Sequence, residues 1–175
     1  MQRRVLILCA GLILVGQMTG CRQGANDALR FNDQIAGATK KLERAGASFF
    51  TSAGMAVEGG NPGDISNAEQ ALRLLKIQLQ GAKDEATKMT VPPGKTTKEL
   101  HDAYLRFLEV ETTIVDRDFE EIIAILKNTT MNLNDKESQV QIVSTRAEKL
   151  EQPVLAALQI AQQKLAKEFG FALGK

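Results

Sequence analysis

Residues 66–90 read SNAEQALRLLKIQLQGAKDEATKMT and carry apolar side chains at alternating intervals of four and three residues. The members of this stripe are Ala68, Leu72, Leu75, Leu79, Ala82, Ala86 and Met89. Because an α-helix has 3.6 residues per turn, this spacing brings all of these side chains to one face. The stretch therefore predicts an amphipathic helix that buries this face against other helices.

Two further segments carry stripes with the same spacing. The first, residues 26–57, contains Phe31, Ile35, Ala38, Leu42, Ala45, Phe49 and Ala53. The second, residues 135–169, contains Val143, Ala147, Leu150, Val154, Ala157, Ala161 and Leu165. Pro153 interrupts the second segment, because its ring removes one backbone donor and clashes with the carbonyl of Lys149. We expect a kink at Pro153 or two helices in tandem, since the stripe continues on both sides.

The segment 97–127 is also helical in pattern, but its stripe shifts by one position in the middle. Leu100, Tyr104 and Phe107 begin the stripe, and Val115, Phe119, Ile122 and Leu126 continue it one position later. A single helix that bridges the two parts places Glu111 in the stripe. A buried carboxyl has a raised pKa and can act as an acid or base. The alternative places Glu111 at the rim of the core, paired with Lys or Arg.

Turn residues separate these four segments at positions 59–63, 91–94 and 128–134. The expected capping boxes are Ser66 with Glu69, Thr96 with Glu99, and Asn134 with Glu137. Four amphipathic helices joined by short connections predict an all-α protein. Its expected architecture is an antiparallel up-down-up-down four-helix bundle over residues 27–175, with the fourth helix kinked at Pro153.

The first 20 residues have the layout of an export signal. Arg3 and Arg4 form a basic start, and residues 5–15 form an apolar run that is shorter than the ~20 residues needed to span a bilayer. The following Met18-Thr19-Gly20-Cys21 resembles the lipobox of bacterial lipoproteins. This resemblance implies cleavage after Gly20, diacylglycerol on Cys21, and acylation of the new amino terminus by a fatty acid such as palmitate.

An uncleaved signal anchor or an ordinary secretory signal is the alternative interpretation of the same residues. The lipoprotein interpretation divides the chain into a signal peptide (1–20), a short lipidated tether (21–26) and the bundle. It places the bundle outside the cytoplasm, held at a membrane of the bacterial cell envelope by Cys21. Arg22 follows the cysteine, which implies the outer membrane if the cell is Gram-negative.

The composition of the mature chain excludes several classes of function. Removing residues 1–20 leaves 155 residues with 20 basic and 21 acidic side chains, so no basic surface favours nucleic acid. Trp is absent and Tyr104 is the only tyrosine. Cys9 lies in the signal segment, so a lipidated Cys21 leaves neither a free thiol nor a disulfide.

Candidate catalytic and cofactor residues are few. His101 is the only histidine, which is too few for the Glu-x-x-His pairs of a di-iron bundle, and the Cys-x-x-Cys-His haem motif is absent. His101 and Met89 flank the turn at 91–94, so they are weak candidates for a ligand or haem site, as is Glu111. No metal, cofactor or catalytic set is predicted.

The segment 97–127 has a wider apolar face than one seam requires, so Val115, Phe119, Ile123 and Leu126 are candidate interaction residues. The alternative is a thick core within one chain. Residues 92–95 (Pro-Pro-Gly-Lys) and 100–109 (LHDAYLRFLE) are similar to a stretch in small helical bacterial lipoproteins that have no assigned activity.

These observations predict a non-enzymatic lipoprotein that presents a helical bundle to a protein partner or a second copy, or that supports the envelope. The alternative is a bundle that binds a small apolar ligand or haem in its core or end cavity. A buried Glu111 or a cavity beside the third helix favours the alternative.

Overall fold

The computed structural model describes the backbone of residues 6–173 and the side chains of residues 23–173. The predicted signal peptide and Cys21 lie outside the residues whose side chains are described. The elements in order are α1 (Leu6–Gly59), α2 (Pro62–Lys88), α3 (Lys95–Thr113), the π-helical turn η1 (Ile114–Phe119), α4 (Glu120–Lys127) and α5 (Leu133–Phe169). No strand occurs between residues 6 and 173.

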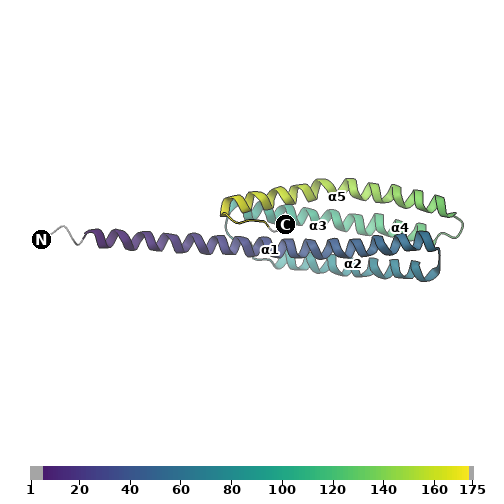
Figure 1. Ribbon diagram of the computed structural model, residues 1–175, viewed down its shortest axis with the longest axis horizontal. Helices are drawn as coiled ribbons and strands as arrows, with labels where there is room; N and C mark the ends of the chain where they lie inside the picture. Colours follow the sequence, from purple (N-terminus) through teal and green to yellow (C-terminus); the bar gives the residue numbers. More distant parts are fainter. Residues whose placement is uncertain (1–5, 174–175) are drawn as a thin grey trace.

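The described chain forms four helical segments, because α3, η1 and α4 follow one another without a break. Figure 1 shows these segments side by side, with successive connections at alternate ends. The prediction of an all-α protein is confirmed. The third segment ends at Lys127 and the fourth at Phe169, as the turn residues and the stripes predicted.

The helix starts differ from the predicted capping boxes. Asn61 caps α2 and Asn132 caps α5, and each side chain accepts a hydrogen bond of 3.0 Å from the backbone N–H three residues later. The partners, Asp64 and Asp135, accept a side-chain hydrogen bond from the same asparagine. The helices therefore begin earlier than Ser66 and Asn134, because an Asn-x-x-Asp pair satisfies the first-turn donors sooner along the chain.

The third predicted capping box is also wrong, for a different reason. α3 begins at Lys95 after Gly94, and no side chain caps it. The Thr96 hydroxyl is buried without a partner among the described residues. The Thr97 hydroxyl instead donates to the carbonyls of Pro92 and Gly94, at 2.7 and 2.9 Å. This contact anchors the Pro-Pro-Gly turn to the helix that follows it.

Two other boundaries were predicted incorrectly. Residues 23–26, expected as part of a tether, are helical and belong to α1. Pro153 lies inside α5, which continues as one helix on both sides. The alternative of two helices in tandem is therefore wrong.

The one-residue shift in the third stripe has a structural cause in η1. A π-helical turn contains one residue more than an α-helical turn. The residues from Ile114 to Phe119 absorb this extra residue, so that Phe107 before the turn and Phe119 at its end both face the core. The shift in the sequence thus marked a π-turn.

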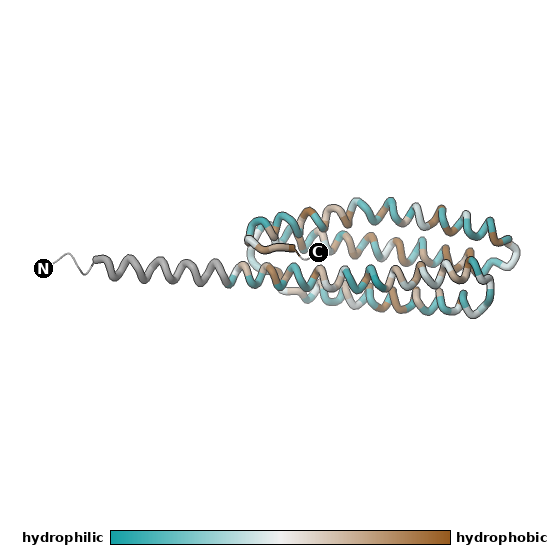
Figure 2. Tube along the Cα trace, viewed as in Figure 1, coloured by the Kyte–Doolittle hydropathy of each residue, from teal (hydrophilic) through white to brown (hydrophobic). Residues whose placement is uncertain are grey.

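The core runs along the whole bundle and contains most of the predicted stripe residues. Figure 2 shows apolar positions recurring along each helix between hydrophilic ones. The tail after α5 turns back at Gly170, which has a φ of 71°, and Phe169 and Phe171 pack against the core. The hydroxyl of the fully buried Tyr104 has no partner among the described residues, and burial raises its pKa to about 12.

We predict that Pro153→Ala stabilises the protein. Alanine restores the backbone N–H that proline lacks, so the free energy of unfolding in urea is expected to rise by about 1 to 3 kcal/mol. Gln152→Ala at the neighbouring exposed position is the control, because it removes no proline. A loss of stability in Pro153→Ala would mean that packing around α5 requires the proline.

Candidate functional site

A groove of about 500 Å³ lies between α1, α3, η1 and α5, and we name it the Glu111 groove. Carboxylates from three helices line it: Glu43 on α1, Glu111 on α3, and Glu148 and Glu151 on α5. Among the described side chains that line the groove, none is Lys, Arg or His. The groove therefore concentrates negative charge that its own walls do not balance.

Between the carboxylates, the walls of the groove are apolar. Leu42, Phe50, Phe107, Ile114, Phe119 and Ala147 provide most of this surface. The ring of Phe119 stacks on Phe49, with centroids 4.6 Å apart, and meets Phe50 edge-on at 5.0 Å. Aromatic pairs of this kind contribute about 0.5 to 1.5 kcal/mol beyond the area they bury, so these rings help to hold η1 against α1.

The carboxyl of Glu111 is largely withdrawn from water. Its Oε1 atom is buried and has no hydrogen-bond partner among the described residues. Burial, followed by the negative charge of Glu151, raises the pKa of Glu111 to about 8. At neutral pH Glu111 therefore holds a proton. The prediction that Glu111 faces the core is confirmed in part, since its side chain is half-buried.

Glu151 occupies an inward position that the sequence pattern assigned to Leu150. The Leu150 side chain is 39% exposed, whereas Glu151 is half-buried and Leu158, rather than Ala157, enters the core. Burial is the main cause that raises the pKa of Glu151. A hydrogen bond with Glu111 acts in the opposite direction, and repulsion from Glu148 and Glu43 adds to the rise. The two carboxyls, Glu111 and Glu151, thus favour holding a proton between them.

An ion cluster lies next to the groove. Asp118, in η1, is fully buried, and its Oδ1 accepts a hydrogen bond of 2.7 Å from Nε of Arg146 on α5. Arg117 donates to Asp118 at 2.8 Å, and Arg146 also donates to Glu121. Burial alone would raise the pKa of Asp118, but the hydrogen bonds and charges of both arginines outweigh it and lower the pKa.

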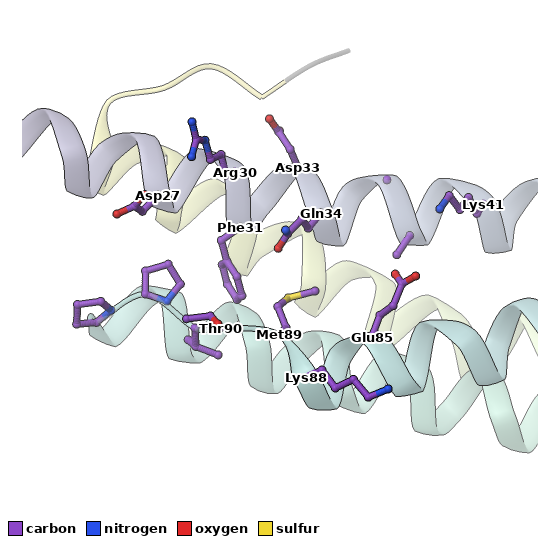
Figure 3. A pocket seen from close by; sticks show the side chains of 15 residues that line it. Asp27, Arg30, Phe31, Asp33, Gln34, Lys41, Glu85, Lys88, Met89 and Thr90 are labelled. Carbon is purple, nitrogen blue, oxygen red and sulfur yellow. The ribbon is translucent and has the colours of Figure 1, made fainter.

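A second hollow, the Met89 groove, has a volume of about 910 Å³ and lies between α1 and the end of α2. Figure 3 shows Phe31, Gln34 and Met89 pointing into the gap between these helices, while Arg30 and Asp33 point away from α2. Three acidic and three basic residues line it: Asp27, Asp33, Glu85, Arg30, Lys41 and Lys88. Its charges balance, so we regard it as the weaker site.

His101 lies near the Met89 groove but does not line it. Its Nε2 donates a hydrogen bond of 3.1 Å to the carbonyl of Ala86, and its ring centroid is 6.3 Å from that of Phe31. The histidine thus ties α3 to the last turn of α2. Met89, His101 and Glu111 do not form one site, because Glu111 lines the other groove.

The predicted interaction residues of the third helix are all in the core. Val115, Phe119, Ile123 and Leu126 are each at most 5% exposed, so the prediction of a docking face there is wrong. The wide apolar face exists because η1 and α4 contact three other helices. Apolar side chains are exposed elsewhere, including Met55, Leu74 and Ile77 on α1 and α2.

Sequence reasoning missed Asp118, Arg146 and Glu151. The shifted stripe was the available signal for Asp118, because a π-turn brings the residue before Phe119 to the inner face. Arg146 carried no local signal, since its role depends on a contact 28 positions away in the sequence. Glu151 was hidden by the assumption that Leu150 continued the stripe.

Comparison of the chain with protein-family models, with curated proteins and with solved structures gave no match. Within the described part of the chain, no helix has an apolar stretch long enough to cross a bilayer. Among the same residues, no three or more His, Cys, Asp or Glu side chains, those of the groove included, form a group that could hold a metal ion. The inference about function therefore depends on the grooves themselves.

We predict that Glu111→Gln removes a pH dependence of stability. The folded-state pKa of Glu111, about 8, exceeds the unfolded value of about 4.3, so wild-type stability falls as the pH rises between these values. Each pKa unit corresponds to about 1.4 kcal/mol, and water that enters the groove reduces the total. We expect the variant to be more stable by about 1 to 3 kcal/mol at pH 9 and unchanged at pH 4.

Urea unfolding at both pH values measures this difference, and Glu109→Gln is the matched control. Glu109 lies on the same helix but is exposed, so its replacement should leave the pH profile unchanged. Equal effects of the two substitutions would show that Glu111 ionises as a solvated carboxyl.

Proposed function

We propose that this protein is a non-enzymatic, lipid-anchored bundle that binds a small organic cation with an apolar portion in the Glu111 groove. The observation that carries the proposal is the set of four carboxylates from three helices, with no basic side chain among the described residues of the groove wall. The proposal modifies the small-ligand alternative, which named a small apolar ligand or haem, because Glu111 is half-buried and a cavity lies beside the third helix.

The chemistry of the groove favours a cation over a neutral or anionic ligand. An ammonium group provides N–H donors for Glu151 and for the unpartnered Oε1 of Glu111. Hydrogen bonds to charged groups contribute about 1.5 to 3 kcal/mol each. The apolar walls provide for burial of a hydrocarbon or aromatic portion. Binding of the cation competes with the proton that Glu111 holds at neutral pH.

The proposed location rests on the resemblance of residues 18–21 to a lipobox. Lipid on Cys21 would hold the protein at a membrane of a bacterial envelope, with the bundle outside the cytoplasm. Glu43 follows Cys21 by 22 residues on α1, which corresponds to about 33 Å of helix. The groove would therefore lie within ~33 Å of the lipid anchor along the helix axis.

We also propose that the four helical segments form an antiparallel up-down-up-down bundle and that α5 is bent at Pro153. The alternate placement of the connections in Figure 1 supports this topology. The missing N–H of Pro153 supports the bend. A bend near Glu151 would turn this side chain towards Glu111, which fits the inward position of Glu151.

A protein partner is the second candidate. The observation that favours it is a set of exposed apolar side chains on α1 and α2, where Met55, Leu74 and Ile77 are 58, 54 and 64% exposed. Met55 and Leu74 line one shallow hollow together. A partner helix or a second copy could cover this surface.

We predict that the protein binds 4-phenylbutylamine more tightly than 4-phenylbutanol. The two probes share an apolar portion, so their difference isolates the ammonium group. Isothermal titration calorimetry at pH 8 should show a preference for the amine of about tenfold or more, equivalent to about 1.4 kcal/mol.

Two variants of α5 sharpen this experiment. Glu151→Gln should remove most of the preference, whereas Glu137→Gln should not, because Glu137 is exposed and does not line the groove. Equal affinity for the two probes in the wild-type protein would contradict the proposal and direct attention to the Met55–Leu74 surface.

We predict that Cys21 carries the lipid. Cells that express the protein and are fed an alkyne analogue of palmitate should yield a labelled protein in the membrane fraction, and Cys21→Ser should abolish both the label and the membrane association. Cys9→Ser is the control and should change neither. Labelling that persists in Cys21→Ser would exclude this anchor.

A further inference from the structure

The π-turn and the Glu111 groove share the same residues. Ile114 and Phe119, the first and last residues of η1, both line the groove, and Glu111 lies three residues before the turn. π-Turns inside α-helices are rare and often occur at functional sites. The geometry of this wall of the groove therefore depends on whatever holds η1 in place.

Asp118 and Arg146 form that contact. Asp118 is at 0% exposure within η1, and Arg146 reaches it from α5 with a 2.7 Å hydrogen bond. Thr145 and Ala147, the neighbours of Arg146, line the groove, although Arg146 does not. The Asp118–Arg146 pair thus links the η1 wall of the groove to the α5 wall, although neither residue itself lines the groove.

The Asp118–Arg146 pair also fixes the position of the positively charged Arg146 guanidinium. Arg146 lies two residues before Glu148 and five before Glu151 on the same helix. Its guanidinium is engaged by Asp118 and Glu121. Since no basic side chain is among the described lining residues, an arginine released from Asp118 would bring a cation of α5 towards the groove.

We propose that Asp118 and Arg146 are positioning residues: they fix η1 and keep the arginine charge out of the Glu111 groove, so that its carboxylates stay free for a cationic ligand. The benefit to a cationic ligand rests on the proposed function, but the effect of the two residues on the groove can be tested without any ligand. The charged groups that face Glu111 are Glu43 from α1 and Glu148 and Glu151 from α5, while α2 contributes only Leu75 to the groove.

The test follows the protonation of Glu111 by carboxyl ¹³C NMR in the purified protein, with Glu111→Gln used for assignment. In Asp118→Asn, Arg146 loses its buried acidic partner and turns to the groove, and the midpoint of Glu111 should fall by about one pH unit or more. In the double variant Asp118→Asn/Arg146→Gln the arginine of α5 is absent while Arg117 is kept, and the midpoint should return to within a few tenths of a unit of the wild-type value.

This rescue assigns the fall in the Glu111 midpoint to the charge of Arg146. Lys164→Gln is the control: it breaks an ion pair between α5 and Glu99 of α3, and neither residue lies in η1 or lines the groove. Its Glu111 midpoint should match the wild type.

Circular dichroism verifies that each variant folds. If Asp118→Asn does not fold, Glu121→Gln provides the same test, because Glu121 is 43% exposed and its replacement loosens Arg146 without burying an unpaired charge. A smaller fall in the Glu111 midpoint is then expected. An unchanged midpoint in the folded variant would overturn the inference.

Binding of 4-phenylbutylamine separates this inference from the proposed function. The affinity should fall about tenfold in Asp118→Asn and recover in the double variant. If the wild-type protein does not bind the amine but the midpoints follow the expected pattern, the positioning role holds and the proposed ligand class is wrong. If the amine binds but the midpoints do not change, the proposed ligand class holds and the positioning role is wrong.

Discussion

The third helical segment contains one residue more than a regular α-helix can place between its two apolar stripes, and the rest of the structure depends on how this residue is absorbed. In a regular α-helix Phe107 and Phe119, 12 positions apart, would lie about 120° apart around the axis. The π-turn at Ile114–Phe119 reduces this angle, and both side chains are buried. The same turn brings Asp118 into the interior, where a buried carboxylate needs cationic partners.

The partners of Asp118 determine the charge of the neighbouring groove. Arg146 spans from α5 to Asp118 and Glu121, so its charge is satisfied behind the groove wall. Glu43, Glu111, Glu148 and Glu151 are left facing a partly apolar hollow without a counter-charge in its described lining. Burial, followed by the negative charge of Glu151, favours a proton on Glu111 in this hollow. The π-turn that places apolar side chains in the core thus also affects the charge of the groove.

Much of the fold followed from local patterns in the sequence. The apolar stripes predicted the helices, and the turn residues predicted where they are joined, because both depend on residues a few positions apart. The caps at Asn61 and Asn132 were missed because Asn-x-x-Asp was not considered beside Ser-x-x-Glu. The site was only half predicted: Glu111 stood out as a carboxylate in a stripe, whereas Glu151 and Arg146 depend on contacts between distant segments.

We conclude that Glu111 is protonated at neutral pH because its carboxyl is buried beside the negative charge of Glu151. Infrared difference spectroscopy of the wild-type protein against Glu111→Gln tests it directly, since a protonated carboxyl has its own C=O stretching band. We expect this band at pH 7, its loss on titration to pH 9, and its absence in the variant. A carboxylate signal from Glu111 already present at pH 7, with no protonated band, would contradict it.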